Sequence, residues 1–139
     1  MADKTQPAPG SCLCGAVRYE VRGPLADVHV CHCGQCRRQS GHCVAGTGAK
    51  RADFVLVEER GLTWYRSSDW ARRGFCAECG SALFWDDDGE EISISAGSLD
   101  QPTGLKVTKH IYVDEKGDYY EIADDLPKFE GHDTPVASD

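Results

Sequence analysis

The spacing of the cysteines constrains the fold of this chain more than any other feature of the sequence. Seven of the eight cysteines fall into two groups. One group joins Cys12-Leu13-Cys14 to Cys76-Ala77-Glu78-Cys79, and the other is Cys31-His32-Cys33-Gly34-Gln35-Cys36. In a reducing compartment such groups more often bind metal or carry chemistry than form disulfides. The spacing therefore predicts a fold organised around two metal–thiolate sites.

The first group has the spacing of a closed metal site. Alternation along an extended chain puts Cys12 and Cys14 on the same side, and the two-residue gap lets Cys76 and Cys79 surround one ion from a tight turn. A glycine follows each pair directly and tolerates the turn that such a site needs. We therefore predict a structural zinc on these four thiolates.

The second group offers only three thiolates. Cys33 and Cys36 span the start of a short helix predicted over residues 34–40 and capped by Gly41, where free backbone N–H groups favour thiolates. Three ligands leave a tetrahedral zinc one position short, as in catalytic sites that admit water or substrate. Cys31, Cys33 and Cys36 are therefore predicted to be catalytic and to hold a second, open zinc. The alternative is a closed site whose fourth ligand is His29, His32, His42 or His110.

Other residues near the groups have two interpretations each. Cys43 is expected to be a small buried residue rather than a ligand. Arg37 and Arg73 lie close to the cysteine groups, and each is either a solvated charge or a contact for a peptide carboxylate. His110 is expected to be a core or surface histidine, with a substrate contact as the alternative.

Length and turns indicate one domain. A chain of 139 residues is long enough to bury a core without disulfides. Residues 1–9 and 132–139 are small, polar and proline-bearing, which predicts flexible tails around a zinc-binding domain at 10–131. The stretches between turns are short and rich in β-branched or aromatic residues. Strands are expected at 16–22, 27–31, 54–57, 62–66, 82–85, 91–96, 107–113 and 119–122.

This pattern predicts a mainly β fold, with a small, mostly antiparallel sheet and one short helix. In Ile92-Ser93-Ile94-Ser95 the isoleucines would face the core. The net charge of −8 would repel phosphate backbones, so nucleic acid is not an expected partner. No stretch approaches the ~20 apolar residues of a membrane helix, and residues 1–7 lack the apolar core of a signal peptide. A cytoplasmic location without membrane association is expected.

Five stretches follow one another in a recognisable order. They are residues 10–17 (GSCLCGAV), 31–37 (CHCGQCR), 73–81 (RGFCAECGS), 96–100 (AGSLD) and 126–129 (LPKF). In this order they resemble the glutathione-dependent formaldehyde-activating enzyme family, which also includes centromere protein V. The resemblance covers residues 10 to 131.

The resemblance implies a tent-like β fold with two zinc ions per chain. A structural zinc would lie on Cys12, Cys14, Cys76 and Cys79, and a second zinc on Cys31, Cys33 and Cys36 would lie near a bound thiol such as glutathione. The implied reaction joins formaldehyde to glutathione or runs in reverse as a carbon–sulfur lyase, as in S-(hydroxymethyl)glutathione synthase. The sequence specifies neither the physiological thiol and aldehyde nor the oligomeric state.

Two other function classes fit the same cysteines. The fold could be a non-catalytic binding module in which zinc only stabilises the chain. It could instead be a redox or metal-handling protein whose three-cysteine site loses zinc and forms a disulfide on oxidation.

Overall fold

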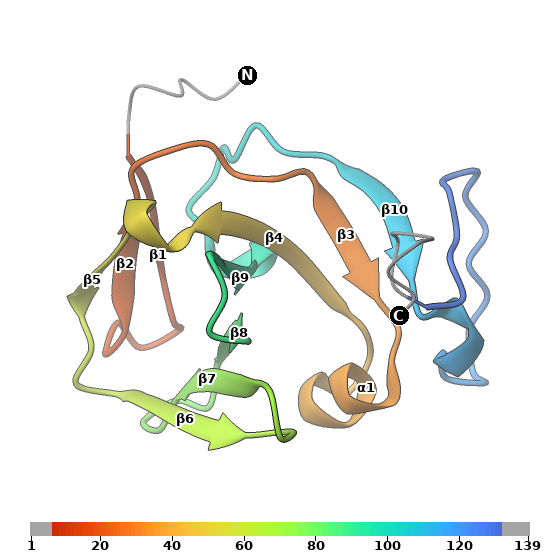
Figure 1. The fold of residues 1–139 in the computed structure, drawn as a ribbon, viewed down its shortest axis with the longest axis horizontal. Coiled ribbons are helices and arrows are strands. Elements are labelled where there is room, and N and C mark those ends of the chain that lie inside the picture. Colours follow the sequence, from red (N-terminus) through yellow and green to blue (C-terminus); the bar gives the residue numbers. More distant parts are fainter. Residues whose placement is uncertain (1–6, 132–139) are drawn as a thin grey trace. The chain divides into compact units, whose positions relative to one another are not determined.

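The structure is a computed structural model, described here for residues 7–131 (Figure 1). The chain forms two compact units. Among the described residues, the first unit contains residues 7–26 and Thr47–Leu105, and the second contains Asp27–Gly46 and residues 106–131. Residues 1–6 and 132–139, which hold most of the two predicted tails, lie outside the described residues. The first strand begins at Ala8, inside the predicted N-terminal tail, and the boundaries of a single domain at 10–131 stay a prediction.

The first unit consists of antiparallel strands. Three of them pair in the order β1-β2-β5, and four more form the run β9-β8-β7-β6. Their bounds are β1 Ala8–Ser11, β2 Arg18–Val21, β5 Phe54–Glu58, β6 Leu62–Arg66, β7 Arg72–Cys76, β8 Ala82–Asp86 and β9 Glu91–Ser95. Two 3-10 turns, η1 (Arg51–Asp53) and η2 (Ala96–Ser98), complete the described elements of this unit.

The second unit contains β3 (Val28–Cys31), α1 (Gly34–Ser40), β10 (Val107–Ile111) and η3 (Val113–Glu115). The strand β4 (Val44–Lys50) begins in this unit and continues into the first. Here β3 pairs with β4 antiparallel and with β10 parallel. The mainly β class with a single α-helix is confirmed for the part of the chain that the structure describes.

The predicted helix is confirmed at both ends. α1 covers Gly34–Ser40, and Gly41 ends it in the left-handed conformation with φ of 88°. The expected strand at 119–122 is wrong, because these residues form a turn and irregular chain. Three strands were not expected, namely β1, β4 and β7.

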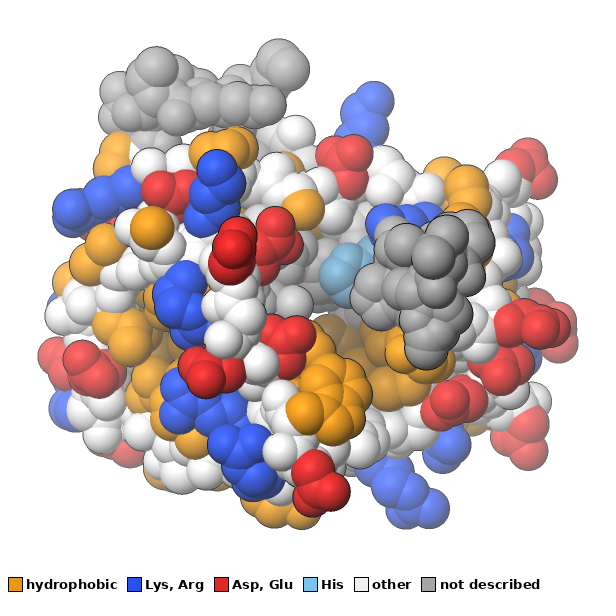
Figure 2. Space-filling model, in the orientation of Figure 1, with side chains coloured by type: hydrophobic (Ala, Val, Ile, Leu, Met, Phe, Trp, Pro, Cys, Tyr) orange, Lys and Arg blue, Asp and Glu red, His pale blue; other side chains and the backbone are white. Residues whose placement is uncertain are grey.

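Charged side chains of both signs are interspersed over the face shown in Figure 2, and no continuous basic surface covers that face. Within residues 7–131 the structure has no helix with the length and apolar character that crossing a membrane requires.

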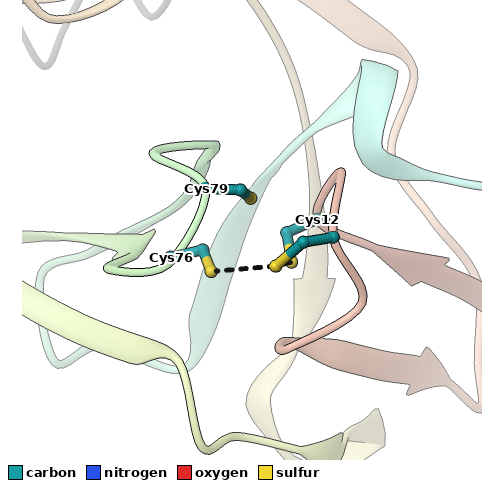
Figure 3. Close-up of side chains that lie close together, drawn as sticks. Cys12, Cys76 and Cys79 are labelled. Atoms are coloured by element: carbon teal, nitrogen blue, oxygen red, sulfur yellow. Dashed lines mark hydrogen bonds between the residues drawn. The ribbon is translucent and has the colours of Figure 1, made fainter.

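The two cysteine pairs of the first group lie at two turns of the first unit. Figure 3 labels three of these four cysteines. The glycines that follow the pairs, Gly15 and Gly80, have φ of 87° and 84°. Side chains with a Cβ rarely adopt this left-handed conformation, so glycine allows both turns to close around the sulfurs. The turn role predicted for these glycines is confirmed.

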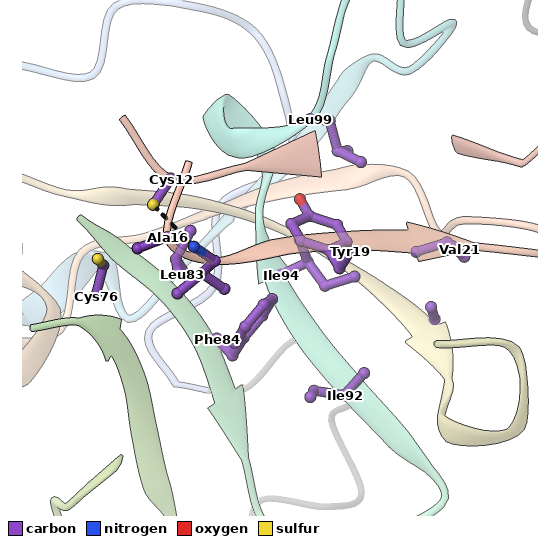
Figure 4. Packing of buried hydrophobic residues seen from close by; sticks show 12 residues of the cluster. Cys12, Ala16, Tyr19, Val21, Cys76, Leu83, Phe84, Ile92, Ile94 and Leu99 are labelled. Atoms are coloured by element: carbon purple, nitrogen blue, oxygen red, sulfur yellow. Dashed lines mark hydrogen bonds between the residues drawn. The ribbon is translucent and has the colours of Figure 1, made fainter. Parts of the chain in front are cut away.

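The core of the first unit lies directly beside these turns (Figure 4). Ile92 and Ile94 are both buried, as the alternation along β9 predicted. Tyr19 packs edge-on against Phe84, with ring centroids 5.3 Å apart. Cys12 and Cys76 belong to the same cluster, so the apolar core and the first cysteine group are continuous.

Candidate metal centres

The four cysteines of the first group converge in space. Cys12 and Cys14 follow β1, Cys76 ends β7, and Cys79 lies in the turn after it. Their sulfurs all lie within 4.8 Å of one another, and the Cys12–Cys14 and Cys14–Cys76 separations are both 3.8 Å (Figure 3). A tetrahedron with zinc–sulfur bonds of about 2.3 Å has sulfur–sulfur edges of about 3.8 Å. The four thiols therefore fit one zinc ion.

Hydrogen-bond donors surround these sulfurs. The backbone N–H of Val17 donates to Cys12 Sγ at 3.3 Å, and the N–H of Glu78 donates to Cys76 Sγ at 3.4 Å. The hydroxyl of Ser81, followed by its backbone N–H, lowers the pKa of Cys79 to about 5. Donors that favour thiolates are what a site of anionic ligands requires.

The second group is also assembled. Cys31 is the last residue of β3, Cys33 is the N-cap of α1, and Cys36 lies buried in the first turn of the helix. Their three sulfurs lie within 4.8 Å of one another. Cys33 Sγ accepts the backbone N–H of Cys36 at 3.3 Å. The strand end and the helix start thus place three thiols around one point.

These three thiols do not ionise independently. Hydrogen bonds from the thiols of Cys31 and Cys36 lower the pKa of Cys33 to about 2. Cys33 and then Cys36, followed by burial, raise the pKa of Cys31, because a second negative charge beside Cys33 is unfavourable. A divalent cation would offset that repulsion and allow all three to be thiolates. The donor set therefore fits a thiophilic metal such as zinc.

A buried chain of hydrogen bonds lies beside this group. His32, between Cys31 and Cys33, has its Nδ1 2.6 Å from Tyr120 Oη and its Nε2 2.9 Å from His110 Nδ1. His110 Nε2 lies 2.9 Å from Asp124 Oδ2. Both ring nitrogens of both histidines are therefore engaged, and neither histidine offers a lone pair to a metal in this arrangement.

The pairing of strands explains how this series of hydrogen bonds forms. Parallel pairing sets Ile111 of β10 opposite Cys31 of β3, so His110 lies near the start of the cysteine group. The backbone of His110 also bonds to Pro127 and Phe129, which brings Asp124 to its ring. The sequence stretch 126–129 thus serves to hold the far end of the chain of hydrogen bonds.

Burial and charge shift the pKa values of two residues in this series of hydrogen bonds. Burial, followed by the neighbouring imidazole of His110, lowers the pKa of His32, which favours the neutral ring. The hydrogen bond from His110 lowers the pKa of Asp124, which keeps this carboxylate ionised. As a carboxylate, Asp124 accepts a hydrogen bond from His110 Nε2, and the neutral ring of His32 donates through one nitrogen and accepts through the other.

Within the described residues, no fourth ligand atom from His, Cys, Asp or Glu lies beside the three sulfurs of the second group. Among residues 7–131, no histidine or carboxylate joins Cys31, Cys33 and Cys36 within the 4.8 Å that unites the group. His42, one of the histidines considered from the sequence, has its Nδ1 2.8 Å from Tyr119 Oη. Cys43 is half-buried just before β4 and belongs to neither group.

Sequence reasoning did not find Tyr120 or Asp124. Tyr120 lay in a stretch expected to be a strand, and Asp124 is 92 residues from His32 (124 − 32). No local spacing links these positions, because the pairing of β3 with β10 brings them together. The only signal was the presence of two histidines, one in each paired segment.

Comparison with known proteins identifies the family. A family model described as glutathione-dependent formaldehyde-activating enzyme matches residues 7–115. The chain belongs to this family. All seven grouped cysteines and His110 lie inside the matched region of this family member, whereas Tyr120 and Asp124 lie beyond it.

Relatives of this family member cover most of the chain. An uncharacterized lyase of Schizosaccharomyces pombe is 25% identical over 122 residues, which is 86% of this chain and 88% of the relative. A putative glutathione-dependent formaldehyde-activating enzyme of Halomonas elongata is 29% identical over 129 residues, covering 81% of this chain and 79% of the relative. A crystal structure of a Rhodobacter sphaeroides protein, with 30% identity and a TM-score of 0.56, covers 72% of this chain and 99% of that one.

Proposed function

We propose that this protein is a zinc-dependent carbon–sulfur lyase-type enzyme that forms or cleaves the adduct of a thiol and an aldehyde. The observation that carries the proposal is the convergence of Cys31, Cys33 and Cys36 without a fourth protein ligand among residues 7–131. The full engagement of His32 and His110 in other hydrogen bonds supports an open position. Family membership and the names of two relatives favour glutathione and formaldehyde as the substrates.

The two cysteine groups would have different roles. Cys12, Cys14, Cys76 and Cys79 would hold a structural zinc, because four sulfurs close the coordination sphere. Cys31, Cys33 and Cys36 would be the catalytic site. When bound there, zinc would supply a positive charge that keeps a substrate thiol in its reactive thiolate form at neutral pH. A cytoplasmic location, where glutathione and free thiols persist, belongs to the same proposal.

The residues of the chain supply position and proton control. The thiolate of Cys33 is favoured by the N–H of Cys36, and His32 is held on both sides by Tyr120 and His110. In adduct formation the sulfur bonds to the carbonyl carbon. The proton lost from the sulfhydryl is matched by one gained at the carbonyl oxygen. The reaction therefore needs no oxidant or reductant, and cleavage is its reverse.

The test compares two single-cysteine variants. The rate of adduct formation between glutathione and formaldehyde is measured by NMR exchange spectroscopy, with the uncatalysed rate subtracted. Wild type and Cys43→Ser are expected to accelerate exchange. Cys33→Ser should lose about 100-fold or more of that acceleration, because it loses a metal ligand. Equal acceleration by Cys33→Ser and Cys43→Ser would contradict the proposal. A wild type that fails to accelerate exchange for every pair of thiol and aldehyde tested would also contradict it.

A further inference from the structure

The stretch from Glu115 to Tyr120 contacts the second cysteine group on both sides of Cys33. Before Cys33, His32 has its Nδ1 2.6 Å from the hydroxyl oxygen of Tyr120. After it, the backbone N–H of Gly34 donates to Glu115 Oε1 at 2.9 Å. These two contacts join residues that are 88 and 81 positions apart in the sequence. One short stretch of the second unit therefore holds both neighbours of a proposed metal ligand.

The contact from Glu115 supplies an acceptor that α1 lacks. The first N–H groups of a helix have no partner within the helix. The side chain of the N-cap, Cys33, accepts from the N–H of Cys36, and the first turn of α1 contains no acidic residue. Glu115 provides the acceptor for the N–H of Gly34. Because this N–H belongs to the planar peptide that links Cys33 to Gly34, the contact fixes the orientation of that peptide.

The turn that carries Glu115 contains a strained residue. Glu115 ends η3, and the residue before η3, Tyr112, adopts the left-handed conformation with φ of 55°. A residue with a Cβ rarely adopts this conformation, and it persists where the surrounding contacts require it. The backbone N–H groups of Tyr112 and Val113 donate to the carbonyls of Gly131 and Phe129 and so hold the turn. The strain lies in the turn that brings Glu115 to the cysteine loop.

Burial does not explain the contact, because Glu115 is exposed. A hydrogen bond at the surface replaces one to water, so it adds little to the stability of the whole fold. Its effect is therefore expected at the peptide that it orients. A cation also borders this peptide, since Arg37 Nη2 and Glu115 Oε1 each lie 3.7 Å from a Cβ built on Gly34. With both charges present, the hydrogen bond is the property that distinguishes Glu115.

We propose that Glu115 is a positioning residue that orients Cys33 for metal binding at the second cysteine group. The inference rests on the proposed function, because it concerns the ligand geometry of the same site. Glu115 would contact neither the metal nor the substrate and would act through the N–H of Gly34. Removal of residues that orient metal ligands in this way typically costs about 10- to 100-fold in metal affinity.

The test measures the affinity of the second group for cobalt, a spectroscopic substitute for zinc. Competition with a chelator is followed through the sulfur-to-cobalt absorption. Glu115→Ala removes the acceptor and should weaken cobalt binding at the second group about tenfold or more, while the first group keeps its wild-type affinity. Glu115→Gln should bind cobalt as wild type does, because its amide oxygen accepts the same N–H. Asp114→Ala changes an exposed carboxylate of the same turn and is the matched control.

Hydrogen exchange of the Gly34 amide provides a second readout that does not depend on catalysis. In the cobalt- or zinc-loaded protein this amide should exchange slowly in wild type, in Glu115→Gln and in Asp114→Ala. It should exchange faster in Glu115→Ala, because its acceptor is then lost.

Three results would overturn the role of Glu115. A Glu115→Ala variant that binds cobalt as tightly as wild type would show that the contact does not orient Cys33. A Glu115→Gln variant that binds as weakly as Glu115→Ala would assign the effect to charge instead of to the hydrogen bond. Weaker binding at both cysteine groups would assign Glu115 to the whole fold. Each of these results leaves the proposed function intact, whereas a wild type that binds a single cobalt ion per chain would contradict both.

Discussion

The two cysteine groups use the same ligand atom in different surroundings. The sulfurs of Cys12 and Cys76 are continuous with an apolar core and receive backbone N–H groups. The three-cysteine group instead lies beside Arg37 and a buried chain of two histidines, a tyrosine and a carboxylate. Apolar surroundings and a full ligand set suit stability, whereas ionisable neighbours and an incomplete set suit chemistry. The surroundings of the two groups, more than their thiols, therefore support the different roles proposed for them.

The largest expected effect comes from breaking the four-cysteine group. Cys76→Ser removes a fully buried thiol that we propose binds zinc at the edge of the core, and it should lower the free energy of unfolding by more than about 4 kcal/mol. Urea unfolding followed by tryptophan fluorescence measures this, since all three tryptophans lie in the first unit. Cys43→Ser is the control and should change little. A Cys76→Ser variant that is as stable as this control would contradict the structural role proposed for the four-cysteine group.

Chelation should separate the two groups. A mild chelator is expected to remove one metal equivalent from the three-cysteine group first, because that group has fewer ligands. Catalysis should be lost at this stage while tryptophan fluorescence keeps its folded value. Metal release, activity and fluorescence are measured on the same sample. Simultaneous loss of both metals and of the folded signal would show that the groups do not differ in the proposed way.

Breaking the hydrogen-bonded chain should have a smaller effect, confined to the second unit. His110→Phe keeps an aromatic ring but leaves a nitrogen of buried His32 without its partner, at an expected cost of about 1–3 kcal/mol. The rate of adduct formation should fall about tenfold, because His32 lies between two of the cysteines proposed to be catalytic. His42→Phe removes an exposed hydrogen bond and serves as control.

Hydrogen exchange distinguishes the outcomes of His110→Phe. Amides of β3 and β10 should exchange faster, whereas those of β7 and β8 should not. Faster exchange of amides throughout the protein would mean that the hydrogen bonds of His32 and His110 support the whole fold instead of the second site.

The smallest effect concerns pH. Because the hydrogen bond from His110 lowers the pKa of Asp124 in the folded protein, its stabilisation is present above the unfolded pKa of about 3.9 and disappears as pH falls through the lowered folded value. Wild type should therefore melt slightly above Asp124→Asn at pH 7. The difference should shrink below about pH 4. A difference in melting temperature that does not change over this range would show that the charge of Asp124 does not contribute.

Sequence patterns predicted the parts of the fold that local chemistry determines. α1 was predicted from Gly34 to its cap at Gly41, because left-handed glycine ends a helix. β4 was missed because Gly46-Thr47-Gly48 has the composition of a turn, yet the surrounding strands impose an extended chain. The strand expected at 119–122 was wrong for the opposite reason, since aromatic residues there serve contacts to histidines.

The cysteine groups were also predictable, whereas their neighbours were not. Metal-ligand spacing is short and local, so both groups could be read from the chain, and the structure brings together the sulfurs of each. The series of hydrogen bonds that links Tyr120 to Asp124 through two histidines depends on parallel pairing of β3 with β10, which no local pattern encodes. The contact of Glu115 with the N–H of Gly34 likewise becomes visible only when the surroundings of α1 are known.

The most direct test of the central claim is zinc-edge X-ray absorption of the zinc-loaded protein with the selenol analogue of glutathione. Selenium scatters differently from sulfur, so it marks a substrate atom among cysteine ligands. If the three-cysteine group is open and the four-cysteine group is closed, the spectrum should show about one selenium neighbour for every two zinc ions. Zinc surrounded only by cysteine sulfur and a protein nitrogen, with no selenium, would contradict the account.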